Sequence, residues 1–337
     1  MAIPPPTISL GLQGGGSHGA FTWGVLDRLL EEDQLIIDGI SATSAGSINA
    51  VVLAYGLAVG GREGAKEALT HFWRRMSAMA TSSIFQASIL DKIMGNFGLD
   101  YSVGFTLTNM LCQFLSPYQL NPLNLNPLKN LLEEVVDFER IRQQTAVKIF
   151  LCATNVRTCK LKIFCVGELT ANHVLASSCL PFLMHAVDID GERYWDGGFT
   201  GNPALFPLIH ECEARDIMLV HLTPTQRPDF PITANSILSR MQEVSLNSSL
   251  MREMRAVAFV NKLIDQAQMT GGKKILVHVI EAEDVISKLP NTSKMNGDWD
   301  FLLHLYDIGR RRADDWLASN FDLLGIESSI DFQTKYL

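Results

Sequence analysis

The strongest constraint on the fold is a unit of apolar run, small-residue turn and helix that occurs twice near the start of the chain. The first copy contains the glycine-rich turn GGGSHG, and its parts lie at residues 7–12, 14–19 and 20–31. The second copy contains the turn SATSAGS, and its parts lie at residues 35–37, 41–47 and 48–57. Strand, turn and helix in repeated order are typical of a parallel α/β sheet.

The rest of the chain continues this pattern and then becomes more helical. Apolar or alternating runs predict further strands at residues 146–152, 160–166, 217–222 and 274–280. Helical spacing predicts helices at residues 128–135, 237–268 and 299–320. Pro224, Pro228 and Pro231 interrupt the regular pattern between the two parts. We therefore expect an α/β domain over residues 1–225 and a mainly helical C-terminal extension, packed on the core, over residues 226–337.

Composition excludes some classes of partner and site. The chain has 28 Lys and Arg against 36 Asp and Glu, a formal charge of −8, which argues against nucleic acid because phosphate backbones attract basic surfaces. Its six cysteines form no CxxC pair and no zinc spacing, so we expect no metal site. No uninterrupted apolar run is long enough to predict a membrane span.

The turn of the second unit contains a serine in a position suited to a nucleophile. Ser44 follows a strand and precedes a helix, and a sharp turn at that point lifts the hydroxyl above the sheet. The residues two before and two after must be small because strand and helix nearly touch there, and they are Ala42 and Gly46. The helix beginning at Ala45 directs its N-terminal dipole at the serine. A serine that only caps the helix fits the same pattern.

The turn of the first unit contains three consecutive glycines. Backbone amides without side chains can bind a phosphate or the oxyanion of a tetrahedral intermediate. Gly14, Gly16 and Gly19 also spell GxGxxG, the dinucleotide fingerprint, and Asp38 follows at about the distance of its ribose-binding acid. Against that reading, the second strand runs directly into the Ser44 turn, where a dinucleotide-binding domain holds the ribose. A purely structural tight turn is the third alternative.

A third motif, Tyr-Trp-Asp-Gly-Gly, ends in Asp196 and two glycines. Asp188, Asp190 and Gly191 predict a hairpin turn, and the strand after it leads to Asp196. None of the eight histidines stands in a motif expected of a catalytic histidine, and a carboxylate held against a serine can act as its base instead. An ordinary Ser-His-Asp esterase stays open, with its base drawn from His210, His221, His278 or His304.

These three motifs, in this order, resemble the patatin-like phospholipases. The resemblance includes ASSCLP at residues 176–181 and Asn202-Pro203, so that it spans roughly the first 220 residues. It implies a three-layer α/β/α patatin-like sandwich with a mostly parallel central sheet, in which residues 1–225 form the catalytic domain. Where the family usually has Arg or Lys, this chain has His18.

The resemblance also implies a role for each part of the motifs. It implies that Ser44 is the nucleophile and Asp196 its base, in a two-residue dyad that needs no metal or organic cofactor. It implies an oxyanion hole made of the backbone amides of Gly14, Gly15, Gly16 and Ser17. It further implies supporting residues around the dyad, namely Ala42, Ala45, Gly46, Gly197 and Gly198.

The activity implied by the resemblance is hydrolysis of lipid acyl esters through an acyl-enzyme intermediate. The expected partners are a phospholipid or another fatty-acyl ester and, transiently, a membrane or micelle surface, with no nucleic acid. Because no Sec signal is visible, we expect a cytoplasmic enzyme peripheral at membranes, and leaderless secretion stays open. A non-catalytic lipid- or dinucleotide-binding protein is the remaining alternative.

Residues 101–128, here called the uncharged segment, contain no charged side chain. Their Pro and Asn content excludes one continuous membrane helix. One interpretation is a buried helix followed by a loop over the core. The other is an apolar lip beside Ser44 that contacts lipid, because exposed apolar patches often mark membrane or ligand sites.

Overall fold

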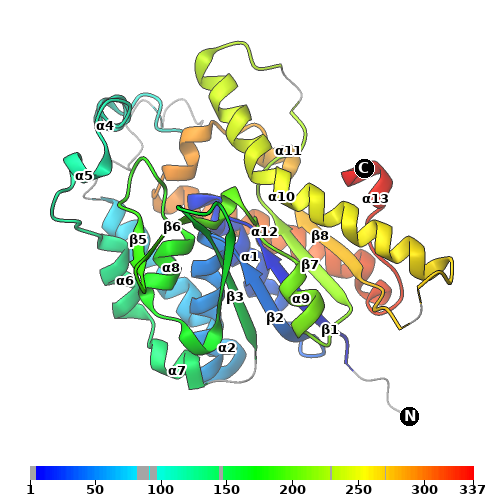
Figure 1. The fold of residues 1–337 in the computed structure, drawn as a ribbon. Helices are drawn as coiled ribbons and strands as arrows, with labels where there is room; N and C mark the ends of the chain where they lie inside the picture. The colour runs from blue at the N-terminus through cyan, green and yellow to red at the C-terminus, as the bar shows by residue number, and fades with distance from the viewer. Residues whose placement is uncertain (1–4, 82–90, 92–96, 144–146, 228–229, 270) are drawn as a thin grey trace.

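The computed structural model describes residues 5–81, 91, 97–143, 147–227, 230–269 and 271–337. A twisted central sheet runs through the molecule, with helices on both faces (Figure 1). Within the described residues the sheet has eight strands, in the order β5-β6-β3-β2-β1-β7-β8, and β4 also pairs with β3. The pairs β1·β2, β2·β3, β1·β7 and β7·β8 are parallel, whereas β4, β5 and β6 are antiparallel to their neighbours.

The strands follow the predicted runs closely. They are β1 (Thr7–Leu12), β2 (Ile36–Ala42), β3 (Lys148–Asn155), β4 (Leu161–Cys165), β5 (Val187–Ile189), β6 (Glu192–Asp196), β7 (Asp216–His221) and β8 (Leu276–Glu281). The predicted hairpin before Asp196 is confirmed, because β5 and β6 pair across a turn in which Asp190 and Gly191 have φ values of 54° and 81°. Positive φ at both positions suits the tight twist of a two-residue hairpin.

The longer helices pack on the two faces of the sheet. They are α1 (Gly19–Leu29), α2 (Ala45–Thr81, interrupted at Gly60 and Gly61), α6 (Pro127–Val135), α8 (Ala171–Ser177), α10 (Ala234–Asp265) and α12 (Trp299–Asn320). Helix α4 (Val103–Leu111) has no buried residue and does not belong to these layers. Shorter helices are α5 (Pro117–Leu120), α7 (Phe138–Gln143), α9 (Phe206–Glu211), α11 (Glu283–Ile286) and α13 (Phe332–Tyr336). A mostly parallel sheet between helical layers, with further C-terminal helices, confirms the predicted fold class.

The sheet is buried on both faces, as its strand sequences require. Along β7, Met218 and Val220 belong to the core shared with α1, α2 and α12, whereas Ile217 and Leu219 belong to the core under α9 and α10. Alternate side chains of a strand point to opposite faces, so a strand covered on both sides is apolar throughout. This accounts for the unbroken apolar runs that predicted the strands.

Residues 226–337 contribute to the sheet as well as covering it. Their strand β8 pairs with β7, and α12 lies directly on α1. The two helices approach to backbone contact at two glycines. A Cβ added to Gly24 would lie 2.0 Å from the Tyr306 carbonyl oxygen, and one added to Gly309 would lie 2.1 Å from that of Phe21. Larger residues at either position would separate α12 from the α/β core.

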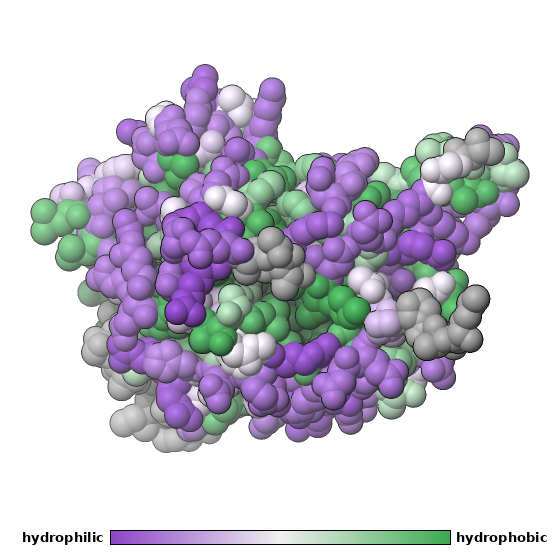
Figure 2. Space-filling model, turned by 90° about the horizontal axis from the view of Figure 1, so that it is seen from below, coloured by the Kyte–Doolittle hydropathy of each residue, from purple (hydrophilic) through white to green (hydrophobic). Residues whose placement is uncertain are grey.

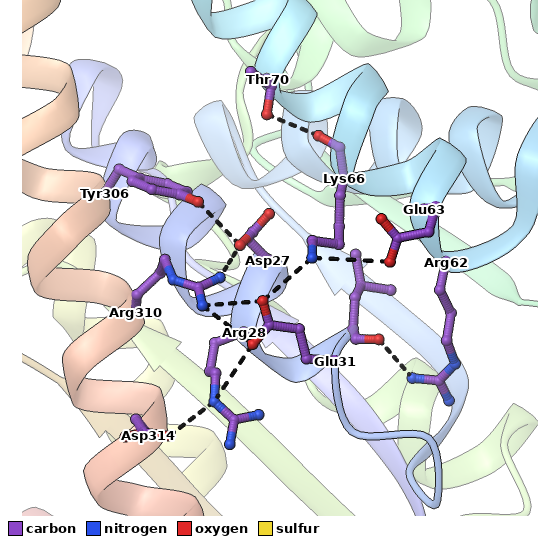
Figure 3. A network of polar contacts seen from close by, with 11 residues as sticks. Asp27, Arg28, Glu31, Arg62, Glu63, Lys66, Thr70, Tyr306, Arg310 and Asp314 are labelled. Atoms are coloured by element: carbon purple, nitrogen blue, oxygen red, sulfur yellow. Dashed lines mark hydrogen bonds and ion pairs between the residues drawn. The ribbon is translucent and has the colours of Figure 1, made fainter.

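Charged side chains join α12 to α1 and α2 (Figure 3). Arg310 of α12 forms an ion pair with Asp27, which is 4% exposed, and also binds Glu31 at 3.0 Å. The Tyr306 hydroxyl donates to Asp27 at 3.0 Å, and Lys66 of α2 reaches Glu31 at 3.2 Å. Arg310, the first of three consecutive arginines in α12, thus makes an interhelical contact.

The edge of the sheet where the parallel strands begin differs from the edge where they end. Figure 2 shows the molecule from below, the side on which these strands begin: a mostly hydrophilic rim surrounds a hollowed hydrophobic area. The turns that contain the sequence motifs follow β1 and β2, and therefore lie at the opposite edge. No helix among the described residues is long and apolar enough to cross a membrane.

Candidate active site

Ser44 occupies a strained turn between β2 and α2. Its φ is 56°, a left-handed conformation that is uncommon for a residue with a side chain. The turn brings Gly46 against β1, since a Cβ there would lie 2.3 Å from the carbonyl oxygen of Leu12. Ala42 is fully buried, whereas Ser44 is only partly buried. Small neighbours therefore let strand and helix approach closely while the serine stays accessible.

Asp196 ends β6 and is 5% exposed. Its backbone amide donates to the Cys179 carbonyl at 2.9 Å, and its carbonyl accepts from the Thr154 hydroxyl at 2.8 Å. The carboxylate oxygen Oδ1 accepts from the Gly198 amide at 2.7 Å. Gly197 packs against β3, where a Cβ would lie 2.2 Å from the Cys152 carbonyl oxygen. The two glycines thus let the chain turn tightly beside the carboxylate.

The two residues meet although 152 positions separate them in sequence (196 − 44). The Ser44 side chain faces the Asp196 carboxylate, and the interaction between the two lowers the pKa of that carboxyl group. Burial raises the pKa of Asp196 to about 6, although the hydrogen bond from Gly198 and the interaction with Ser44 oppose that rise. A carboxylate with this pKa is ionised at neutral pH and is more basic than an exposed aspartate. It can therefore accept a proton from the serine.

Ser177, at the end of α8, supports the serine turn. Its hydroxyl accepts from the Ser44 amide at 3.1 Å and lies 2.7 Å from the Ser47 hydroxyl. Its carbonyl also accepts from the Ser44 amide, at 3.2 Å. Ser177 belongs to the ASSCLP motif, but sequence alone assigned it no role. The contact depends on how α8 packs beside the turn.

The glycine loop lies beside Ser44, and its four predicted donors differ in their surroundings. A Cβ on Gly14 would lie 2.7 Å from the Ser44 Cβ, so glycine is required for this approach. The Gly14 amide donates to the Asn202 side-chain oxygen at 2.8 Å and is therefore already used. Within the described part of the chain, the amides of Gly15, Gly16 and Ser17 have no acceptor.

His18 follows these amides, and its side chain is neutral at physiological pH. It is 2% exposed, and its Nε2 lies 2.8 Å from the hydroxyl of Ser293 in the short helix η4 (Asn291–Met295). Burial lowers the pKa of His18 to about 3, and the nearby cations Lys294 and Arg227 lower it further. His18 therefore supplies no positive charge to the glycine loop.

The four histidines of the alternative triad are engaged elsewhere. His221 pairs with Glu281 at 3.3 Å, and His278 with Asp216 at 2.9 Å. His304 stacks on Phe97, and His210 is an exposed residue of α9. Among the described side chains, no histidine is recorded in a hydrogen bond with Ser44.

Asp38 does not lie where a dinucleotide-binding site needs its ribose-binding acid. It lies in the first half of β2, whereas the glycine loop follows the end of β1. Its carboxylate accepts from the amides of Glu213 and Ala214, at 2.5 and 3.0 Å, and pairs with Lys148 at 3.4 Å. The acid is therefore at the wrong end of the parallel strands to hold a ribose.

The cysteines and acids form no metal centre in the described ranges, where no three His, Cys, Asp or Glu side chains are grouped suitably. The sequence His210-Glu211-Cys212-Glu213 at the end of α9, which contains residue types that can bind a metal, therefore lacks companion ligands among these residues.

The described uncharged segment is exposed, and its interpretation as a buried helix is wrong. No residue of α4 is buried, and Phe114 and Leu123 are 78% and 79% exposed. The segment is attached near the dyad: the Tyr118 hydroxyl accepts from the Ala186 amide at 3.2 Å, and His185 binds the Pro117 carbonyl at 3.1 Å. These contacts join it to the stretch that begins at Cys179, the residue whose carbonyl accepts the Asp196 amide.

Comparison with known proteins gives one family match. Residues 10–209 match the model of the family described as patatin-like phospholipase. The crystal structure of VipD from Legionella pneumophila is similar over 91% of this chain and 67% of its own, with 14% sequence identity and a TM-score of 0.36. No curated protein matches the chain. The family match covers the glycine loop, the Ser44 turn and Asp196 together.

Proposed function

Because the chain belongs to the patatin-like phospholipase family, we propose that it is a serine lipid acyl hydrolase with Ser44 as nucleophile and Asp196 as base. The observation that carries the proposal is the approach of Ser44, held in a strained turn, to the buried Asp196 carboxylate. A pKa of about 6 suits a base that must be ionised at neutral pH and still bind a proton.

The reaction proceeds in two steps. Asp196 accepts the Ser44 proton as Oγ attacks the ester carbonyl carbon, and the bond to the leaving alcohol breaks as that proton passes to its oxygen. Water then loses a proton to Asp196 and attacks the acyl-serine. The bond between the acyl carbon and Oγ breaks as Asp196 returns that proton to Oγ, which releases the fatty acid and restores the serine. No metal or organic cofactor takes part in this scheme.

The negative charge that forms on the carbonyl oxygen is stabilised by backbone amides. The amides of Gly15, Gly16 and Ser17 are available for this role, whereas that of Gly14 holds Asn202. One such donor is worth about 10²- to 10³-fold in rate, since it acts on charge that develops only in the transition state. The predicted four-residue oxyanion hole thus reduces to three candidate donors.

We assign the uncharged segment as the surface that contacts lipid. Its exposed apolar side chains would be costly to keep in water and gain free energy on entering a bilayer or micelle. Its attachment beside Cys179 brings this surface near the dyad. The substrate class in this scheme is a fatty-acyl ester presented at a lipid surface.

A fluorophosphonate probe tests the nucleophile directly. The probe forms a covalent bond only with an activated serine, so peptide mapping by mass spectrometry should find the adduct on Ser44. Product analysis with mixed phospholipids and triacylglycerols should find free fatty acid released by the same preparation. The Asp196→Asn protein should be labelled far more slowly, because its amide cannot accept the serine proton.

Labelling at another serine, or no labelling of a folded protein that still releases fatty acid, would rule out Ser44. Labelling that is unchanged in Asp196→Asn would rule out the aspartate as the base.

A further inference from the structure

The glycine loop is covered by a segment that lies outside the family match. Helix η4 follows α11 and carries Lys294, whose carbonyl oxygen would lie 2.3 Å from a Cβ on Gly16. The Lys294 Cβ would be 3.5 Å from that same position, so the lysine side chain starts next to the loop. Gly16 has a φ of 60° and therefore needs to be glycine both for its conformation and for this contact.

Positive charge exceeds negative charge in this region. Glu243 of α10 is 1% exposed, and although burial raises the pKa of its carboxyl group, three cations lower it overall: Arg227, Arg240 and Lys294. Arg227 and Arg240 both pair directly with Glu243, the latter at 3.0 Å. Among the described residues, one carboxylate thus faces three cations.

Two further carboxylates, those of Glu283 and Asp100, bind uncharged donors instead of these cations. Glu283 accepts from the Thr225 hydroxyl at 2.9 Å and from the Gln226 amide at 2.6 Å. Asp100 accepts from the Thr292 hydroxyl at 3.1 Å. Neither carboxylate is recorded in an ion pair with Arg227, Arg240 or Lys294, the three residues here called the cation cluster.

Lys294 itself lacks a direct partner. Among the described residues its ammonium group makes no hydrogen bond and no ion pair within 4.0 Å, although the side chain is partly buried. Burial and the neighbouring Arg227 lower its pKa, while Glu243 acts in the opposite direction. Among the described residues its Nζ is not one of the fully buried side-chain atoms without a partner, so the ammonium group stays accessible to an anionic group of a ligand.

The cation cluster lies close enough to Ser44 to bind part of a substrate. Gly14 contacts Ser44 and Gly16 contacts Lys294, and two residues of chain span at most about 7 Å. His18, which binds Ser293 next to Lys294, is neutral, so the cations of this region are Arg227, Arg240 and Lys294 and not a residue of the glycine loop. An anionic group that belongs to the same substrate molecule and lies close to the scissile ester would therefore reach Lys294.

We infer that Lys294 and Arg227 form a subsite for the phosphodiester of a glycerophospholipid whose acyl ester is held at Ser44. This inference rests on the proposed function and gives it a substrate class: the site selects phospholipids over neutral acylglycerols. Lys294 binds the phosphate oxygens through its ammonium group, and Arg227 contributes charge from its pair with Glu243. The selecting cation comes from a part of the chain that follows the matched family domain.

The test compares two lipids with the same acyl chains in the same mixed micelles, dipalmitoyl phosphatidylcholine and dipalmitoylglycerol. Lys294→Met should lower kcat/KM for the phospholipid roughly 10- to 100-fold, the range expected for loss of a charged hydrogen bond. The value for dipalmitoylglycerol should stay nearly unchanged. Lys294→Arg should recover most of the loss, and Lys262→Met, an exposed lysine of α10, should behave as wild type.

An equal fall for both lipids, or no fall for either, would overturn the subsite. Binding of glycerophosphocholine and of inorganic phosphate to the unreacted protein, measured by calorimetry, distinguishes the source of the phosphate. We expect glycerophosphocholine to bind wild type and not Lys294→Met, whereas binding of inorganic phosphate alone would contradict a headgroup site. If wild type hydrolyses neither lipid, the proposed function fails. Lys294-dependent binding of glycerophosphocholine would then still support the subsite.

Discussion

At the scale of single residues, the site combines a serine in a strained backbone conformation with a carboxylate whose burial makes its ionised form unfavourable. Ser44 keeps a φ of 56° because Gly46 packs against β1 and the Ser177 side chain holds the Ser44 amide. Strain of this kind persists only where surrounding contacts fix it, and it is common at functional sites. Asp196 is also held in an unfavourable state, since its burial favours the protonated acid over the ionised form that can accept a proton.

The raised pKa of Asp196 predicts how Asp196→Asn changes the free energy of unfolding. The folded-state pKa of about 6 lies above the ordinary value of 3.8, so the folded state binds the proton more tightly than the unfolded state. The free energy of unfolding therefore falls as the pH rises from about 4 to 6, by up to about 3 kcal/mol. Asp196→Asn removes this ionisation, so its stability should not fall over that range.

Chemical unfolding of both proteins at pH 4.5 and pH 7.5 checks this prediction. We expect the variant to lose ester hydrolysis while its stability relative to wild type improves at the higher pH. A variant that is much less stable than wild type at pH 7.5 would contradict the buried, ionised aspartate.

At the scale of elements, sequence located the strands and motifs but not the contacts that join them. Apolar runs and helical spacing of apolar residues are visible without a structure. For this reason β1 and α12 begin and end where we predicted. The roles of Ser177, Asn202 and Lys294 were not predictable. Each contacts a loop more than 100 positions away, and no local pattern records such a distance.

The exposure of the uncharged segment leads to a prediction about lipid binding. Phe114 is 78% exposed, so Phe114→Asp should change the free energy of unfolding by only a few tenths of a kcal/mol. It should weaken binding to phosphatidylcholine vesicles roughly 10-fold or more, since a buried phenyl group gains about 1.5–3 kcal/mol. Co-sedimentation with vesicles measures the affinity, and the fluorophosphonate probe confirms that Ser44 still reacts.

Ile326→Asp is the matched control, because Ile326 is 71% exposed but lies outside the uncharged segment. Equal loss of vesicle binding in both variants would refute a localised lipid-contacting surface.

At the scale of the whole molecule, the C-terminal third is tied to the parts that carry the site. Its strand β8 extends the sheet, α12 packs on α1, and η4 covers the glycine loop. Because α1 follows that loop directly, α12 holds the helix on which the loop ends. We therefore expect residues 226–337 to unfold together with residues 1–225.

Arg310→Met tests this coupling. The change leaves Asp27 buried with Tyr306 as its remaining partner, which should lower the free energy of unfolding by roughly 2–4 kcal/mol. Arg28→Met is the control, since Arg28 pairs with the 65% exposed Asp314 and should cost at most about 1 kcal/mol. Urea unfolding followed by circular dichroism should give a single transition for each protein. Two separate transitions in Arg310→Met would show that the C-terminal third folds independently.

The rate of fatty-acid release by Ser44→Ala, compared with wild type on the same micelles, tests the central claim most directly. The account predicts a folded protein whose rate is lower by at least about three orders of magnitude, because the covalent step has lost its nucleophile. Ser248→Ala should retain full activity, because among the described residues the Ser248 hydroxyl bonds only to the Ser245 carbonyl of its own helix. If purified Ser44→Ala kept more than a few per cent of the wild-type rate, the serine mechanism proposed for this chain would be wrong.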